Sequence, residues 1–282
     1  MTQPTVRRRQ LGNQLRGLRE KQQLTLDDVE KLTGITAAKL SRLETARSAA
    51  KPVDIERLAE AYGCDEPLRA ALVAVAKDGN KRGWWFNYID VLEPWYADQI
   101  SLESSASTFR TYQSHFVPGL FQTADYARAI ITRLGLGILP SDVEARVRVR
   151  RERQSVLTQP QPLDVWAVIH EAALRSRVGG AQIMRGQLEK LLELAALPNV
   201  TIQVMPADAG VHPGMNGAFA IMGFPESALD VVFVEGMLSS QWVEEPAEVS
   251  IFDRAFREIT ADAWPLEKSL DFIAAQKEEM TT

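Results

Sequence analysis

Cysteine is almost absent from this chain of 282 residues, which contains only Cys64. A single thiol excludes an intramolecular disulfide and a zinc site built from cysteines, and it agrees with a reducing compartment. The longest apolar run, residues 70–76, is too short to span a bilayer. No apolar stretch follows the basic N-terminal residues, so we expect no signal peptide. The sequence predicts a cytoplasmic protein with no membrane partner.

Histidine is also scarce, and His115, His170 and His212 are far apart with no ligand spacing. His170 and the following glutamate begin like the zinc motif HExxH, but Leu174 replaces the second histidine. The chain contains no P-loop, no GxGxxG fingerprint and no nucleophile elbow. We therefore expect neither enzymatic activity nor a metal site, and no cofactor.

The net charge of −5 is unevenly distributed along the chain. Residues 1–52 contain eleven Lys and Arg against five Asp and Glu, a net charge of +6, which leaves −11 for the remainder. A basic segment on an acidic body indicates that one part contacts a polyanion. Random drift of charge between domains would give the same pattern.

Five short helices are predicted in the first 77 residues. Residues 24–34 begin with Thr25 as an N-cap and end before Gly34, a typical C-cap. Thr36 caps the next helix. The apolar residues expected on the buried faces of the first two helices are Leu11, Leu15, Leu18, Leu26, Val29 and Leu32. A short helix, a tight turn and a second capped helix form the helix-turn-helix plan, although a small protein-interaction bundle has similar helices.

The segments LRGLRE, LT, GIT and LSRLE fall in one register, and through them residues 11–63 resemble the phage-repressor-like (XRE) helix-turn-helix family. The resemblance implies that Arg19 of the first helix pairs with Glu44 at the end of the recognition helix. A bidentate pair would hold these two helices at a fixed angle. Glu30 departs from the family, which usually has a small residue there, and its carboxylate must reach solvent or a cation.

The resemblance also implies contact with double-stranded DNA through the helix that follows Thr36. Small residues allow close approach to base edges, and Arg42 is suited to a bidentate contact with guanine. The expected base contacts are Ala37, Ala38, Ser41 and Arg42. The expected phosphate contacts are Thr25, Thr36, Lys39, Arg47 and Lys51. The run Arg7–Arg9 is either an arm on the DNA or a solvated tail. Because one such domain buries little surface, we expect a homodimer on a near-palindromic operator.

The chain after the five helices has a different pattern. We place a helix-turn-helix domain at 1–77, a linker at 78–84 and a second domain at 85–282. The aromatic residues of 84–96 suggest a ligand cage or, as we favour, a hydrophobic clasp between the two domains.

The second domain combines helical and strand-like segments. The expected helices are 102–113, 123–134, 141–157, 180–197, 246–263 and 265–279, and the expected strands are 163–170, 199–206, 217–224 and 230–236. The last two strands are close enough for an antiparallel hairpin, and helices are expected on both faces of the sheet. The predicted fold class is multi-domain: an all-α five-helix head and an α+β domain with a small, mostly antiparallel sheet.

The second domain also resembles one found in actinomycete regulators, through FVPGLFQTADYAR, residues 179–206 and GVHPGMNGAFAIMGFPE. That resemblance implies a regulatory, dimerising or partner-binding role. The leading hypothesis is a DNA-binding transcriptional regulator, associated with the nucleoid when bound. The alternative is an antitoxin-like protein that mainly binds a small acidic partner protein. The arginines of 144–157 fit a solvated face first, a surface for such a partner second and a DNA surface third.

Overall fold

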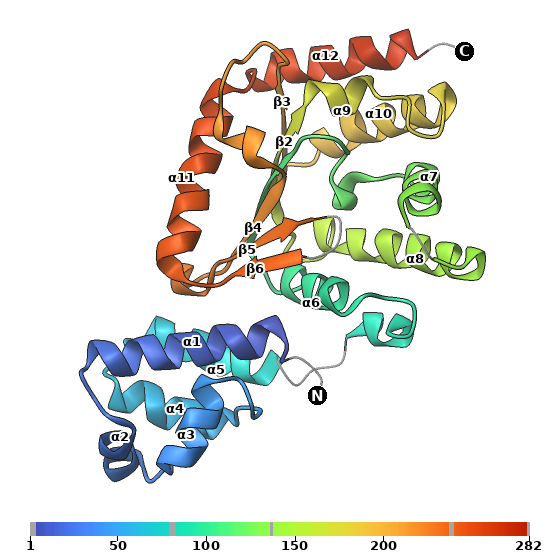
Figure 1. The fold of residues 1–282 in the computed structure, drawn as a ribbon. Coiled ribbons are helices and arrows are strands. Elements are labelled where there is room, and N and C mark those ends of the chain that lie inside the picture. The colour runs from blue at the N-terminus through green and yellow to red at the C-terminus, as the bar shows by residue number, and fades with distance from the viewer. Residues whose placement is uncertain (1–3, 79–82, 136–137, 237–239, 281–282) are drawn as a thin grey trace.

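The computed structural model describes residues 4–78, 83–135, 138–236 and 240–280. Figure 1 shows a helical head formed by the N-terminal part of the chain, packed below a larger body built around a sheet. The helices of the head are α1 (Val6–Lys21), α2 (Leu26–Thr33), α3 (Ala37–Glu44), α4 (Pro52–Ala61) and α5 (Glu66–Asp78).

The head closes around an apolar core to which each of its helices contributes. Leu15, Leu40, Ile55 and Leu72 are fully buried there. The expected buried position at Leu32 is wrong, because this side chain on the outer face of the eight-residue helix α2 is 62% exposed. The predicted helical character of the head is otherwise as observed.

The sheet of the body has six strands in the order β3-β2-β1-β4-β5-β6. The strands are β1 (Thr108–Gln113), β2 (Asp164–His170), β3 (Val200–Met205), β4 (Phe219–Gly223), β5 (Val231–Glu235) and β6 (Ser240–Val243). β1, β2 and β3 are parallel, whereas β4, β5 and β6 continue the sheet in antiparallel order. The hairpin of β4 and β5 is therefore confirmed, and three of the five strand pairings are antiparallel, but the six-stranded sheet is mixed and larger than predicted.

The error arose at β1, since residues 102–113 were predicted to be helical. Residues 108–113 alternate between the two faces of the sheet, and β1 pairs with β2 on one side and β4 on the other. Parallel strands need long crossovers. Helices α7 (Ala124–Leu134) and α8 (Pro140–Arg153) connect β1 to β2, and α9 (Glu171–Arg175) and α10 (Ala181–Ala195) connect β2 to β3. Without β1 in the prediction, the parallel half of the sheet could not be recognised.

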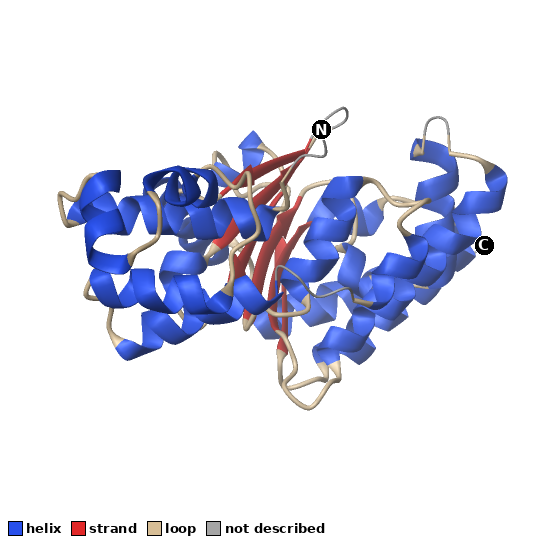
Figure 2. Ribbon diagram, turned by 90° about the horizontal axis from the view of Figure 1, so that it is seen from below, coloured by secondary structure: helices blue, strands red, loops and turns tan. Residues whose placement is uncertain are grey.

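Helices cover both faces of the sheet, as the sequence predicted (Figures 1 and 2). Helix α11 (Pro246–Asp262) packs on one face through Phe256, against Tyr112 and Ile221. On the other face, Phe109 and Met222 lie in a core shared with α10 and with α12 (Leu266–Glu279). Neighbouring residues of a strand point to opposite faces, so apolar residues at successive positions of β4 fill both cores.

The aromatic segment lies within the body. Trp84, Trp85 and Tyr88, from the 3₁₀ turn η1 (Trp84–Tyr88), pack near Tyr96 of α6 (Pro94–Glu103) and Val149 of α8. No head residue belongs to this cluster among the described residues, so these aromatic side chains do not form the proposed clasp between the domains, although Trp95 also packs against the cluster that contains Val6 of α1. The predicted linker 78–84 falls mainly on 79–82, outside the described residues, and the domain limits stay a prediction.

Helix α1 makes the contact between head and body instead. Val6, at its start, lies in the body's core, and Leu229, from the body turn η5 (Ser227–Leu229), lies in the head's core. Phe224 packs against both cores, and the Arg7 guanidinium lies 4.3 Å from its ring centroid. Arg7 and Arg9 are therefore interface residues within α1, and both earlier readings of 7–9, an arm on DNA or a solvated tail, are wrong.

A buried ion pair stabilises the body beneath α8. The Arg153 guanidinium donates to both carboxylate oxygens of Glu103, at 2.5 and 2.6 Å, and to the Tyr96 hydroxyl at 2.8 Å. Both charged side chains are almost completely buried. Arg150 of the same helix donates to Gln122 at 2.7 Å. The arginines of 144–157 thus do not form one solvated face, because two of them bind inside the body.

We expect Glu103→Gln to lower the free energy of unfolding by about 3–5 kcal/mol, because it leaves Arg153 buried without a counter-ion. Urea unfolding of the full chain measures this loss. The double variant Glu103→Met with Arg153→Met should lose less than the single variant. A loss below about 1 kcal/mol for Glu103→Gln would contradict a structural role for the pair.

Candidate nucleic-acid interface

The turn between α2 and α3 is held by local contacts on both sides. Thr25 and Asp28 form a capping box at the start of α2, and the hydrogen bond from the Thr25 hydroxyl lowers the pKa of Asp28. Gly34 ends α2 in the left-handed region at φ 72°, which favours glycine. Ile35 is buried beside it, and Thr36 caps α3 by accepting from the Lys39 amide at 3.3 Å. These contacts fix the direction in which α3 leaves the turn.

Glu30 has a role that the sequence did not reveal. One of its carboxylate oxygens accepts a hydrogen bond from the backbone N–H of Ala37 at 2.8 Å. The carboxylate therefore reaches the N-terminus of α3, where an anion is favoured by the helix dipole. This contact explains why a glutamate is accommodated where the helix-turn-helix family usually has a small residue. Glu30 joins α2 to the start of α3.

Arg19 and Glu44 join α1 to the end of α3. The Nε and Nη2 atoms of Arg19 donate to the two oxygens of Glu44 at 2.7 and 2.9 Å, and Nη1 donates to the carbonyl of Leu24 at 2.9 Å. The hydrogen bond to Glu44 raises the pKa of Arg19. A Cβ atom at Gly12 would lie 2.6 Å from the Glu44 carbonyl oxygen, so the two helix backbones are in close contact. Helix α3 is thereby clamped at both ends.

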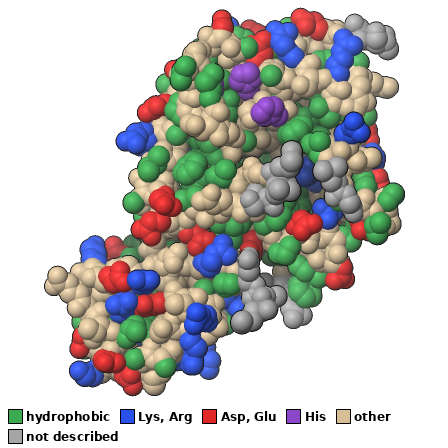
Figure 3. Space-filling model, viewed as in Figure 1, with side chains coloured by type: hydrophobic (Ala, Val, Ile, Leu, Met, Phe, Trp, Pro, Cys, Tyr) green, Lys and Arg blue, Asp and Glu red, His purple; other side chains and the backbone are tan. Residues whose placement is uncertain are grey.

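The clamped helix leaves its predicted base-contacting side open to solvent. Ala38 and Arg42 are exposed, and Ala37 and Ser41 are partly exposed. Among the predicted phosphate contacts, Arg47 and Lys51 lie exposed in the loop between α3 and α4, and Thr25 and Thr36 are exposed at helix starts. Figure 3 shows Lys and Arg side chains gathered along the edge of the head that carries this loop.

Lys39 differs from the other predicted phosphate contacts. Its ammonium group lies 2.7 Å from the carboxylate of Asp54 in α4, whose side chain is only 8% exposed. The ion pair connects α3 to α4 and compensates a buried negative charge. Lys39 is therefore tied into the head, and a phosphate would have to compete with Asp54 for it.

The histidines do not form a centre of the kind that binds metal. His170 accepts from the amide of Ala172 at 3.1 Å, and the ring of His212 lies edge-on to Tyr112 with 5.7 Å between centroids. Within the described ranges, no group of three or more His, Cys, Asp or Glu side chains is placed to hold a metal ion. In the same part of the chain, no helix has the length and apolar content needed to cross a membrane.

The geometry defines a two-part protein, a helix-turn-helix head fixed to an α+β body with a mixed sheet. Residues 10–72 match the family described as Helix-turn-helix domain. Residues 96–275 match the domain of unknown function DUF5753, and the chain belongs to this family. Both matches confirm the expected combination of a helix-turn-helix with a C-terminal domain whose role is undefined.

One curated relative carries a functional name. It is the HTH-type transcriptional repressor RghR of Bacillus subtilis (strain 168), 45% identical over 51 residues. The match covers 18% of this chain and 38% of the relative, so the likeness concerns a segment shorter than the head. No solved structure matches the chain significantly.

We expect Lys39→Ala to lower the free energy of unfolding by about 1–3 kcal/mol, because Asp54 then stays buried without its cation. Thermal or urea unfolding measures the loss. Arg47→Ala, which removes an exposed cation from the neighbouring loop, should change stability by less than about 0.5 kcal/mol. The double variant Lys39→Ala with Asp54→Asn should recover part of the stability, and no recovery would show that the pair is not coupled.

Proposed function

We propose that this protein is a sequence-specific DNA-binding transcriptional regulator. The observation that carries the proposal is the placement of α3. Glu30 holds its start and Arg19 holds its end, while the small and cationic side between Ala38 and Arg42 stays open. A helix clamped on its inner side, with small residues and one arginine outside, suits the width of the major groove.

The contacts divide into two kinds. Arg42 supplies the directional contact to a base edge, and the small side chains Ala37, Ala38 and Ser41 allow close approach. Arg47, Lys51 and the threonines at the helix starts contact phosphates, which set register without reading sequence. Lys39 contributes to the positive potential of the surface, and its main contact is with Asp54.

The protein acts as a homodimer on a near-palindromic operator in the cytoplasm, and it is associated with the nucleoid when bound. Two heads on one face of the duplex would read half-sites about 34 Å apart. The body carries the dimer contact and receives the signal, from a ligand or a partner, that changes the placement of the heads. The name of the relative RghR supports a role in transcription.

A second candidate function rests on α8. Arg148 and Arg151 are exposed on this helix, away from the arginines that bind inside the body. Two exposed arginines on one side of a helix offer ion pairs to a small acidic partner protein. In that case the protein is antitoxin-like, and DNA binding serves its own regulation. Arg148→Glu with Arg151→Glu would then abolish co-purification of the partner without changing DNA affinity.

We expect Arg42→Ala to relax base preference at one position of each half-site, with a loss of about 1–3 kcal/mol of discrimination. Selection of bound duplexes from random DNA, carried out in parallel with wild type and variant, measures the preference. Arg47→Ala should weaken binding to all sequences and lower the slope of log K against log salt by about 1. If wild type selects no sequence and binds no duplex, the proposed function is wrong.

A further inference from the structure

The head is docked on the body, because one side of α1 binds the body directly. Arg9 donates to Glu244 with Nε at 3.0 Å, its Nη2 lies 2.8 Å from the same oxygen, and Asn13 donates to the other carboxylate oxygen at 3.5 Å. Gln10 and Gln14 donate to the carbonyls of Leu229 and Ala228. These contacts are all polar and lie on one helix face, so they hold a defined docking angle.

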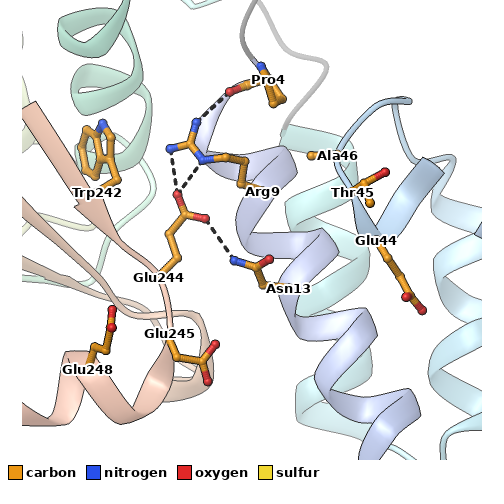
Figure 4. A pocket seen from close by; sticks show the side chains of 10 residues that line it. All are labelled: Pro4, Arg9, Asn13, Glu44, Thr45, Ala46, Trp242, Glu244, Glu245 and Glu248. Carbon is orange, nitrogen blue, oxygen red and sulfur yellow. Dashed lines mark hydrogen bonds and ion pairs between the residues drawn. The ribbon is translucent and has the colours of Figure 1, made fainter. Parts of the chain in front are cut away.

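The docked arrangement brings an acidic edge of the body close to the recognition helix. A cleft of 350 Å³ separates them, lined on one side by Glu44, Thr45 and Ala46 at the end of α3. The opposite side is formed by Trp242 of β6 and by Glu244, Glu245 and Glu248, where the chain enters α11 (Figure 4). Glu245 and Glu248 are exposed, and Arg47, a predicted phosphate contact, follows Ala46 directly.

Such an edge acts on any DNA that the head binds. Thr45 and Ala46 of the head line the same cleft as Glu245 and Glu248 of the body, and charges are screened only beyond about 8 Å at physiological ionic strength. A phosphate held by Arg47 or Lys51 would therefore lie within reach of the repulsion from the body's carboxylates. The chain's charge distribution strengthens the effect, since residues 1–52 of the head carry a net charge of +6 and residues 79–282 carry a net charge of −8.

We propose that the body restrains the head: the docked state binds DNA weakly, and the head separates from the acidic edge when it binds DNA tightly. The proposal rests on the proposed DNA-binding function and adds a means of control. Whatever strengthens docking then weakens DNA binding, because the two contacts oppose each other in one equilibrium.

The docking interface contains a carboxyl group whose ionisation at neutral pH weakens the docking of the head on the body. Asp98 of α6 accepts from the backbone N–H of Val6 at the start of α1, with Arg9 as its nearby cation. Burial raises the pKa of Asp98 to about 6, and burial together with the nearby Asp98 raises the pKa of Glu244. An exposed aspartate titrates near 3.9, so the docked state binds a proton more tightly than the separated state. Docking is therefore strongest below about pH 3.9, and it weakens as the pH rises from there to the docked pKa of about 6.

The first test removes charge from the acidic edge. Glu245→Gln with Glu248→Gln in the full chain should raise the affinity for duplex DNA about 3- to 10-fold at low salt, with the gain shrinking as salt increases. The matched control is Glu189→Gln with Glu267→Gln, two exposed residues on α10 and α12 at the far end of the body (Figure 1). Equal gains in DNA affinity for the test and control variants would mean that only net charge matters, and would overturn the proposal. No gain in affinity for Glu245→Gln with Glu248→Gln would overturn it as well.

The second test strengthens docking. Asp98→Asn keeps an oxygen acceptor for the Val6 amide and removes the buried charge. We expect it to raise Tm by about 2–4 °C at pH 7.5, with the difference from wild type fading as the pH falls through 6. The variant should bind DNA several-fold more weakly at pH 7.5, although it is less negative than wild type. Tighter DNA binding by this variant would contradict the proposal, because net charge alone would then explain the changes in DNA affinity in both tests.

The two ideas fail in different ways. If wild type binds duplex DNA through Arg42 but its affinity does not respond to the edge variants or to Asp98→Asn, the restraint is wrong and the DNA-binding function stands. If wild type binds no duplex under any condition, both are wrong.

Discussion

Helix α1 is the element on which the rest of the structure depends. On one side, Arg19 binds Glu44 through two hydrogen bonds, and Gly12 lets the backbone of α1 touch the end of α3. On another side, Arg9, Gln10 and Gln14 bind the body. A single rigid helix thus joins the surface proposed to read DNA to the domain proposed to receive a signal, and a tilt of α1 on the body moves α3 with it.

The body provides a stiff base for that helix. The strands β1, β2 and β3 are parallel, and the long crossovers between them place α7 to α10 on one face of the sheet. The strands β4, β5 and β6 continue the sheet in antiparallel order. Glu103 and Arg153 lock α6 to α8, and α6 carries Asp98, which accepts from the start of α1. The same helix therefore takes part in the ion pair inside the body and in the contact with the head.

Local signals were sufficient to predict most of the head. Threonine caps, the C-cap Gly34 and the spacing of the leucines depend only on residues close in sequence. The structure has helices at the positions that these signals indicate. The partners of Arg9, Lys39 and Glu30 could not be predicted in the same way, since each depends on how two elements pack. In the body, β1 was missed because it begins only five residues after the end of α6, and strand pairing with residues more than fifty positions away decided its conformation.

The carboxylate of Glu30 at the start of α3 has a consequence for the footprint of the protein on a duplex. Many helices hold a phosphate with the free amides of their first turn, but here a side chain of the protein already occupies one of those amides. A strand passing over that end of the helix would meet like charge. A phosphate contact of Thr36 would therefore be weaker than those of Arg47 and Lys51, which lie in the loop at the opposite end of the helix.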